Sequence, residues 1–142
     1  FDYILNDENK YPGAPSVEQI QIKNKPFVLG DIDVIPIKGF HDKLKVFVFR
    51  FIDFAYLTDM KTVRKEEIEK IKNIRVLVIN ALREKPHQSH FNLEEALEFI
   101  EDVNPEKAYL THISHLLGFH NEVQQKLPKN VFLAYDNLKI TI

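Results

Sequence analysis

The sequence predicts an α/β protein of the α+β kind, in which antiparallel strands precede βα units. Two observations support this fold class. Residues 27–58 contain short runs rich in β-branched and aromatic residues, separated by turn residues. From residue 74 onward, apolar strand patterns alternate with helical patterns, which is typical of parallel βα units. With 142 residues the chain is long enough for a single core, so we expect one domain over residues 1–142.

The first half of the chain reads mainly as strands. Residues 1–5 have the character of the end of a helix or strand, and residues 6–16 are rich in turn formers. Residues 17–22 alternate and predict a strand. Residues 27–29 and 32–37 predict a hairpin around Gly30-Asp31, and residues 45–51 and 53–58 predict two further strands. A short helix with a solvated Lys/Glu face is expected over residues 61–72.

The second half of the chain alternates between strand and helix patterns. We expect strands at residues 74–79, 108–110, 131–135 and 138–142. Asn92 followed by Glu95 is a capping-box pattern, so a helix should begin near Leu93 and end before Pro105. A second helix should run over residues 119–127 and stop at Pro128.

Composition narrows the function classes. The net charge of -2 gives no basic footprint for binding a phosphate backbone, so nucleic acid is a less favoured partner. The absence of cysteine excludes disulfides and thiolate metal sites, which leaves His and carboxylates as metal ligands. No apolar run approaches the roughly 20 residues of a membrane span. Phe1 and its neighbours are neither an initiator Met nor a signal peptide, so we expect a cytoplasmic protein whose chain starts upstream.

Histidines supply the main functional signal. Of the six, five lie in loops just past strands or just before a helix: His41, His87, His90, His112 and His115. Asp59 joins them, because Leu57-Thr58-Asp59 and Leu110-Thr111-His112 end two apolar runs in the same way. If these two strands are neighbours in the sheet, a carboxylate comes to lie beside an imidazole.

Each of these residues also has an ordinary structural interpretation. A single His in a protein is more often a surface residue or a hydrogen-bonding residue than a ligand. His120 and His87 are assigned to that class, and Asp59 could simply cap the helix that follows it.

Together, five motifs in a fixed order resemble those of one enzyme family. They are Gly39-Phe40-His41-Asp42, Leu57-Thr58-Asp59, Ser89-His90-Phe91-Asn92, Leu110-Thr111-His112-Ile113-Ser114-His115 and Ala134-Tyr135-Asp136. They are similar to the second half of a metallo-β-lactamase-fold hydrolase. The closest branch is that of phosphodiesterases of the phosphonate-utilisation type, relatives of ribonuclease Z. The resemblance implies an αββα sandwich of which residues 1–142 form the C-terminal portion.

The resemblance also implies roles for five residues. His41 would bind a first divalent ion, Asp59 would bridge two ions, and His112 would bind the second. His90 would contact the phosphate and act as an acid or electrostatic stabiliser, and His115 would support the site or contact substrate. Zinc or manganese suits such ligands, and two ions of this kind clamp the attacking and leaving oxygens of a phosphodiester. A small phosphodiester is the expected substrate.

One part of the family pattern is missing. The first-half signature His-x-His-x-Asp-His is absent, since no two histidines are separated by one residue. The chain alone should therefore bind little or no metal. It should also expose apolar strands such as Val46-Phe47-Val48-Phe49, which a missing N-terminal half or a second copy would cover. A non-catalytic binding or dimerisation module and a ribonuclease Z-like enzyme stay open as alternatives.

Overall fold

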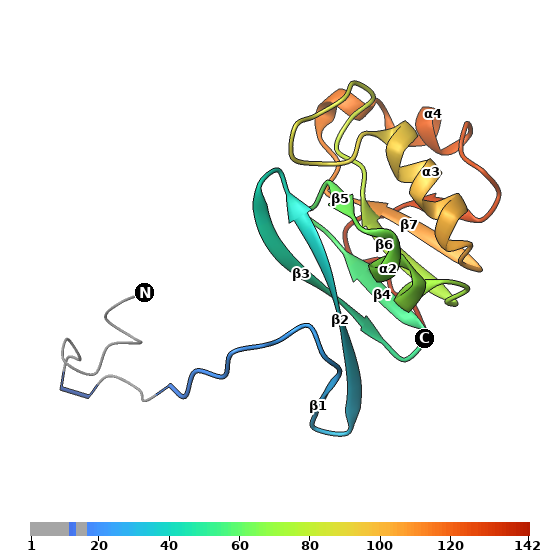
Figure 1. Cartoon of the computed structure of the whole chain (residues 1–142). Helices are drawn as coiled ribbons and strands as arrows, with labels where there is room; N and C mark the ends of the chain where they lie inside the picture. Colours follow the sequence, from blue (N-terminus) through green and yellow to red (C-terminus); the bar gives the residue numbers. More distant parts are fainter. Residues whose placement is uncertain (1–11, 14–16) are drawn as a thin grey trace.

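The computed structural model describes residues 12–13 and 17–142, and it has one mixed sheet with helices packed on one side (Figure 1). The strands are β1 Phe27–Leu29, β2 Ile32–His41, β3 Leu44–Phe51, β4 Phe54–Leu57, β5 Thr62–Val63, β6 Val76–Asn80, β7 Lys107–Thr111 and β8 Val131–Leu133. The helices are α2 Lys65–Ile68, α3 Leu93–Val103 and α4 His120–Gln124, with 3-10 turns η2 Glu69–Ile71 and η3 His115–Leu117. The fold class predicted from the sequence is thus confirmed.

The sheet changes from antiparallel to parallel along its strand order, β1-β2-β3-β4-β6-β7-β8. Strands β1 to β4 form antiparallel pairs, whereas β4, β6, β7 and β8 run parallel. The short strand β5 pairs with the end of β2, where Gly39 faces Val63. A Cβ on Gly39 would come within 3.3 Å of the Thr62 carbonyl oxygen, so this position favours glycine.

Helix α3 begins where the sequence predicts. The Asn92 side chain accepts from the Glu95 N–H, and the Glu95 side chain accepts from the Asn92 N–H, which completes the capping box. The helix ends at Asn104, whose φ of 55° is the left-handed conformation that Asn tolerates well. The apolar face of α3 packs on the sheet through Ala96, Phe99, Ile100 and Val103.

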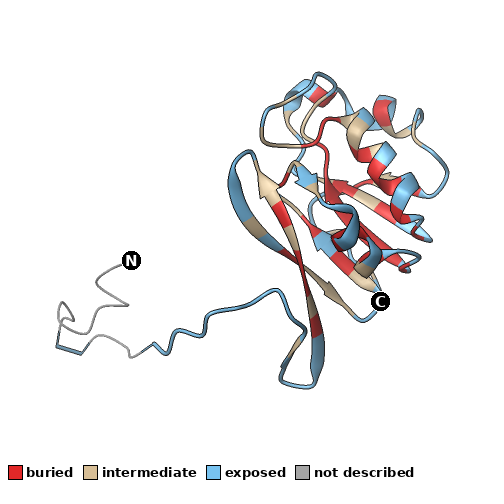
Figure 2. Cartoon of the chain, in the orientation of Figure 1, coloured by how far each residue is buried: buried red, intermediate tan, exposed pale blue. Residues whose placement is uncertain are grey.

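Strand register divides the sheet into two faces. Ala55, Leu77 and Ala108 are paired across one face, as are Leu57, Ile79 and Leu110, and all six are fully buried. On the other face the pairing brings together aromatic side chains that are half-buried or exposed. We call this the aromatic face; its members are Phe49, Phe51, Phe54, Tyr56, Tyr109 and Phe132. Figure 2 shows buried residues concentrated in the sheet centre and on the inward side of α3.

Four predicted elements differ from the structure. Residues 17–22 form no strand, because no other described strand runs beside them, and Ile20 is 79% exposed. The expected helix at residues 61–72 is replaced by β5 and the shorter α2 and η2. Helix α4 ends at Gln124, after which the N–H groups of Lys126 and Leu127 bond three residues back. Residues 138–142 form no strand, since the Leu138 N–H bonds to Tyr135 in a turn.

The predictions for residues 1–5 and most of residues 6–16 fall outside the described residues. Among the helices of the described part, none combines the length and apolar character needed to cross a membrane.

Glu67 is a buried carboxylate that joins three segments. Its two oxygens accept hydrogen bonds from the Asn24 side chain at 2.7 Å, the Lys38 backbone N–H at 2.9 Å and the Lys70 ammonium at 2.6 Å. Burial would raise the pKa of Glu67, but these three partners and the charge of Lys70 outweigh it and lower the pKa. The carboxylate therefore ties α2 and the segment before β1 to the edge of β2.

We expect Glu67→Ala to destabilise the fold by about 2 kcal/mol, because the Lys38 N–H would lose its acceptor inside the protein. Glu67→Gln, which keeps an acceptor there, should cost less. Glu66→Ala is the matched control, since Glu66 is an exposed neighbour whose pair with Arg64 is at the surface. Urea unfolding would measure all three, and equal stability of Glu67→Ala and Glu66→Ala would contradict the assigned role.

Candidate active site

The candidate site lies at the carboxyl edge of the parallel strands. Asp59 follows β4 and His112 follows β7, and both residues have left-handed backbones, with φ of 57° and 55°. This conformation is uncommon for residues other than glycine, although Asp and His adopt it more often than most. It turns the chain sharply at each strand end. The matching endings seen in the sequence therefore correspond to matching backbone turns.

The two strands are separated by β6, so the expectation that they are neighbours is wrong. The two side chains still approach each other beyond the end of β6, whose last residue, Asn80, is fully buried. The Asn80 side-chain oxygen accepts from the Met60 N–H at 3.2 Å and so holds the turn that follows Asp59. Asp59 remains exposed above it, with 62% of its side chain accessible.

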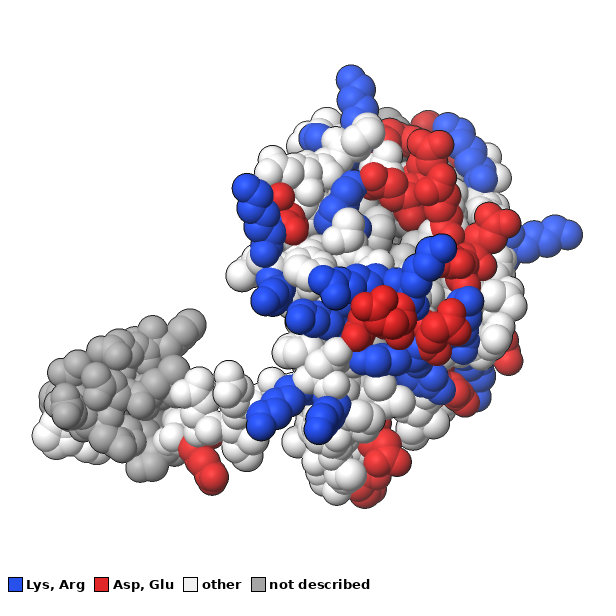
Figure 3. Space-filling model, viewed as in Figure 1, with Lys and Arg blue, Asp and Glu red and all other residues white. Residues whose placement is uncertain are grey.

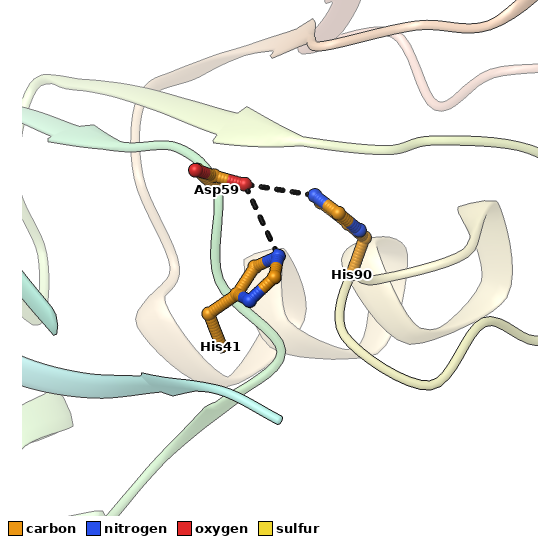
Figure 4. A group of neighbouring side chains, drawn as sticks. All are labelled: His41, Asp59 and His90. Carbon is orange, nitrogen blue, oxygen red and sulfur yellow. Dashed lines mark hydrogen bonds and ion pairs between the residues drawn. The ribbon is translucent and has the colours of Figure 1, made fainter. Parts of the chain in front are cut away.

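Three imidazoles lie around one carboxylate oxygen. Asp59 Oδ1 lies 2.8 Å from His90 Nε2, 3.4 Å from His41 Nε2 and 4.0 Å from His112 Nε2. Figure 4 shows the rings of His41, at the end of β2, and of His90, in the loop before α3, pointing at Asp59. The ring of His90 stacks on that of His112 at 4.8 Å and meets the edge of His41 at 4.7 Å. Four of the five predicted site residues are thus brought together.

The donor set of this cluster fits a divalent metal. His41, Asp59 and His90 each offer a ligand atom, and these atoms lie within 4.8 Å of one another. Imidazole nitrogens with a carboxylate oxygen suit zinc or manganese, and no thiolate is available. His90 is thus one of the three donors, whereas the sequence assigns it to the substrate.

The surroundings of His90 change the pKa of its ring. Burial lowers the pKa of His90, and the neighbouring His112 and His41 lower it further, while the hydrogen bond and charge of Asp59 act in the opposite direction. The ring of His90 is therefore less readily protonated than an exposed imidazole.

Lys61 connects the segments that carry these residues. Its backbone N–H donates to the Phe40 carbonyl at 2.7 Å, next to His41, and its own position is two residues after Asp59. Its ammonium contacts both Glu95 oxygens at 2.5 and 2.6 Å. Glu95 in turn holds the Asn92 N–H, two residues after His90. Lys61 thereby fixes the positions of three of the site residues relative to one another.

His115 lies outside the cluster. It begins η3 and is exposed, and among the described residues its side chain makes no hydrogen bond or ion pair with Asp59. Sequence reasoning missed two neighbours of the site. Lys61 was read as part of a solvated face, and His87 as an ordinary loop residue, yet His87 Nδ1 is 3.1 Å from His90 Nδ1. The three-residue spacing of His87 and His90 was the signal available.

Comparisons with known proteins identify the family and the fold of this chain. The β-lactamase superfamily domain model matches residues 1–113. A crystal structure of a new diphosphatase from the PhnP family is 31% identical, with a TM-score of 0.85 over 89% of this chain and 50% of that one. Human tRNase Z, short form, is 18% identical with a TM-score of 0.64, over 84% of this chain and 48% of that one.

A curated relative is longer than this chain. An octanoyltransferase of Porphyromonas gingivalis is 36% identical over 137 residues, which are 95% of this chain and 28% of that protein. The chain thus spans less than a third of that relative and half of the diphosphatase.

The clamp between Lys61 and Glu95 should be visible in the pH dependence of stability. Burial would raise the pKa of Glu95, but the hydrogen bonds from Lys61 and the Asn92 N–H and the charge of Lys61 outweigh it and lower the pKa. A lowered folded-state pKa stabilises the fold above the usual value of 4.5, and this contribution is lost as the pH falls below it.

We therefore expect Glu95→Gln to cost about 1.5 kcal/mol at pH 7 and much less near pH 3. Urea unfolding across this pH range measures the difference. Glu98→Gln, on the exposed side of the same helix, is the matched control. A cost that does not change with pH would show that Lys61 does not act on the ionised carboxylate.

Proposed function

We propose that the chain supplies one side of a phosphodiester-hydrolysing site. The chain belongs to the β-lactamase superfamily and has the metallo-β-lactamase fold of the PhnP-like hydrolases. The observation that carries the proposal is the convergence of three imidazoles on Asp59 Oδ1 at a sheet edge. The similarity to a diphosphatase supports phosphate-ester chemistry rather than lactam or thioester cleavage.

Each residue would have a distinct task. His41 and Asp59 would hold one divalent ion, and Asp59 and His112 would hold a second, with the carboxylate shared between them. Such ions, when bound, supply positive charge for the attack of water on a phosphodiester. His90 would present Nε2 to the phosphate and donate a hydrogen bond or proton to the leaving oxygen. His115, which lies outside the cluster, would contact the substrate.

The remaining ligands would come from outside these 142 residues. Two protein ligands for each ion are fewer than the three that catalytic zinc usually has, and the chain spans half of the similar diphosphatase. We propose that further sequence of the same hydrolase domain supplies them and also covers the aromatic face. The chain alone would then bind metal weakly. A second copy of the chain is the alternative cover for the aromatic face.

Two other functions are less well supported. RNA processing of the ribonuclease Z kind rests on a similarity of fold alone, at 18% identity. The surface in Figure 3 carries mixed charge, with acidic side chains gathered near α3, and offers no broad basic face in that view. Octanoyl transfer is not proposed, because the chain matches only 28% of that relative.

Hydrolysis of bis(4-nitrophenyl) phosphate by a protein that contains both halves of the site tests the proposal. We expect His112→Ala to abolish turnover, since a ligand is lost, and His90→Ala to lower kcat by about 10²-fold or more. A chelator should abolish activity and zinc or manganese should restore it. His120→Ala is the control, because His120 is exposed on α4. Unchanged turnover in His112→Ala and His90→Ala would leave the non-catalytic module as the better description.

The cover of the aromatic face has its own test. Residues 1–142 alone should bind a hydrophobic dye and self-associate in sedimentation experiments, because Tyr56 and its aromatic neighbours would meet water. A monomer that binds no dye and shows a compact scattering profile would contradict the need for a cover. A stable dimer of defined size would favour the second copy as the cover.

A further inference from the structure

His87 and Ser89 form a polar contact on the side of His90 that faces away from Asp59. His90 Nδ1 lies 3.1 Å from His87 Nδ1 and 2.9 Å from Ser89 Oγ. The other ring nitrogen of His90, Nε2, is the one that lies against Asp59. The ring of His90 is therefore held at both ends, and rotation of its side chain would break contacts on both sides.

Ser89 and His87 are themselves in contact. The Ser89 N–H donates to His87 Nδ1 at 3.3 Å, and Ser89 Oγ lies 3.3 Å from the same nitrogen. The two residues therefore form one polar group against Nδ1 of His90. Because Nδ1 is engaged there, Nε2 is the ring nitrogen that faces Asp59 and the reacting groups.

The loop that carries these residues is itself fixed. Arg83 donates to the carbonyls of Lys85 and Pro86, and the Asn92 side chain donates to the Glu84 carbonyl. At the base of the loop the Leu82 N–H bonds to the Phe91 carbonyl at 2.9 Å. Within this loop His87 is half-buried, whereas its neighbours Pro86 and Gln88 are exposed. His87 is thus turned inward toward His90.

We propose that His87 is a positioning residue that, with Ser89, hydrogen-bonds Nδ1 of His90 and so presents Nε2 to the substrate phosphate. The proposal rests on the function proposed above for His90. Because these contacts lie behind Nε2, the ring keeps its orientation while Nε2 acts on the phosphate. Hydrogen bonds of this kind, behind the group that acts, typically change activity by about 10–100-fold.

Nuclear magnetic resonance of a protein that contains both halves of the site gives a readout that does not depend on turnover. With ¹⁵N-labelled histidine, we expect a scalar coupling between the Nδ1 nuclei of His87 and His90 across the hydrogen bond. It should persist in Ser89→Ala, which retains both rings, and vanish in His87→Asn. If the wild-type protein shows no such coupling, the proposal is wrong.

Kinetics with bis(4-nitrophenyl) phosphate, in a protein that contains both halves of the site, complete the test. His87→Ala should lower kcat about 10-fold with little change in KM. His87→Asn should recover most of the rate, because its side-chain oxygen replaces Nδ1 as acceptor. His120→Ala should behave as wild type. If His90→Ala is impaired but His87→Ala is not, the positioning role fails. If neither is impaired, the proposed function of His90 fails first.

Discussion

The sharp turn of the backbone after β4 and β7 is the constraint on which the site depends. Asp59 and His112 both adopt the left-handed conformation, with φ of 57° and 55°, which turns the chain at the edge of the sheet. Such conformations cost of order 1–3 kcal/mol each and persist only where the surroundings hold them. Here the buried strands beneath supply the support, since Leu57, Ile79 and Leu110 are fully buried at the same edge. The core therefore stabilises the turns, and the turns place the ligand atoms.

A second layer of polar contacts sets distances between segments that are far apart in sequence. His41, Asp59 and His90 come from a strand end, a turn and a loop, and none of these would hold its neighbour in place alone. Lys61 connects these segments. Its backbone N–H donates to the Phe40 carbonyl, and its ammonium donates to both carboxylate oxygens of Glu95. Because Glu95 also caps α3, the helix that packs on the core is coupled to the loop that carries His90. Packing and ligand geometry are thus connected through a single carboxylate.

Sequence reasoning predicted the fold class, the strands of the sheet other than β5, and the capping box, because apolar strand runs and the Asn92–Glu95 pair are local signals. It failed where a contact with another segment of the chain determines the local structure. The alternating residues 17–22 form no strand without a neighbour, and residues 61–72 divide because Gly39 lets β5 pair with β2. Four of the predicted site residues meet in space, whereas His115 does not. Lys61 and His87 were missed, since their importance lies in contacts across the chain that no local pattern encodes.

The exposure of Asp59 and of the aromatic face can be explained together. Phe49, Tyr56 and Tyr109 lie in register across β3, β4 and β7, and Asp59 and His112 lie just beyond the ends of two of these strands. A segment that covers the aromatic face would gain apolar burial over several strands. It would also reach the sheet edge, where a carboxylate is 62% exposed and an imidazole 39% exposed. Burying a charge there is costly unless a cation or donor accompanies it. On the proposed function, a segment that covers the aromatic face would also bring metal ligands to Asp59 and His112, so that the core and the site would be completed in one step.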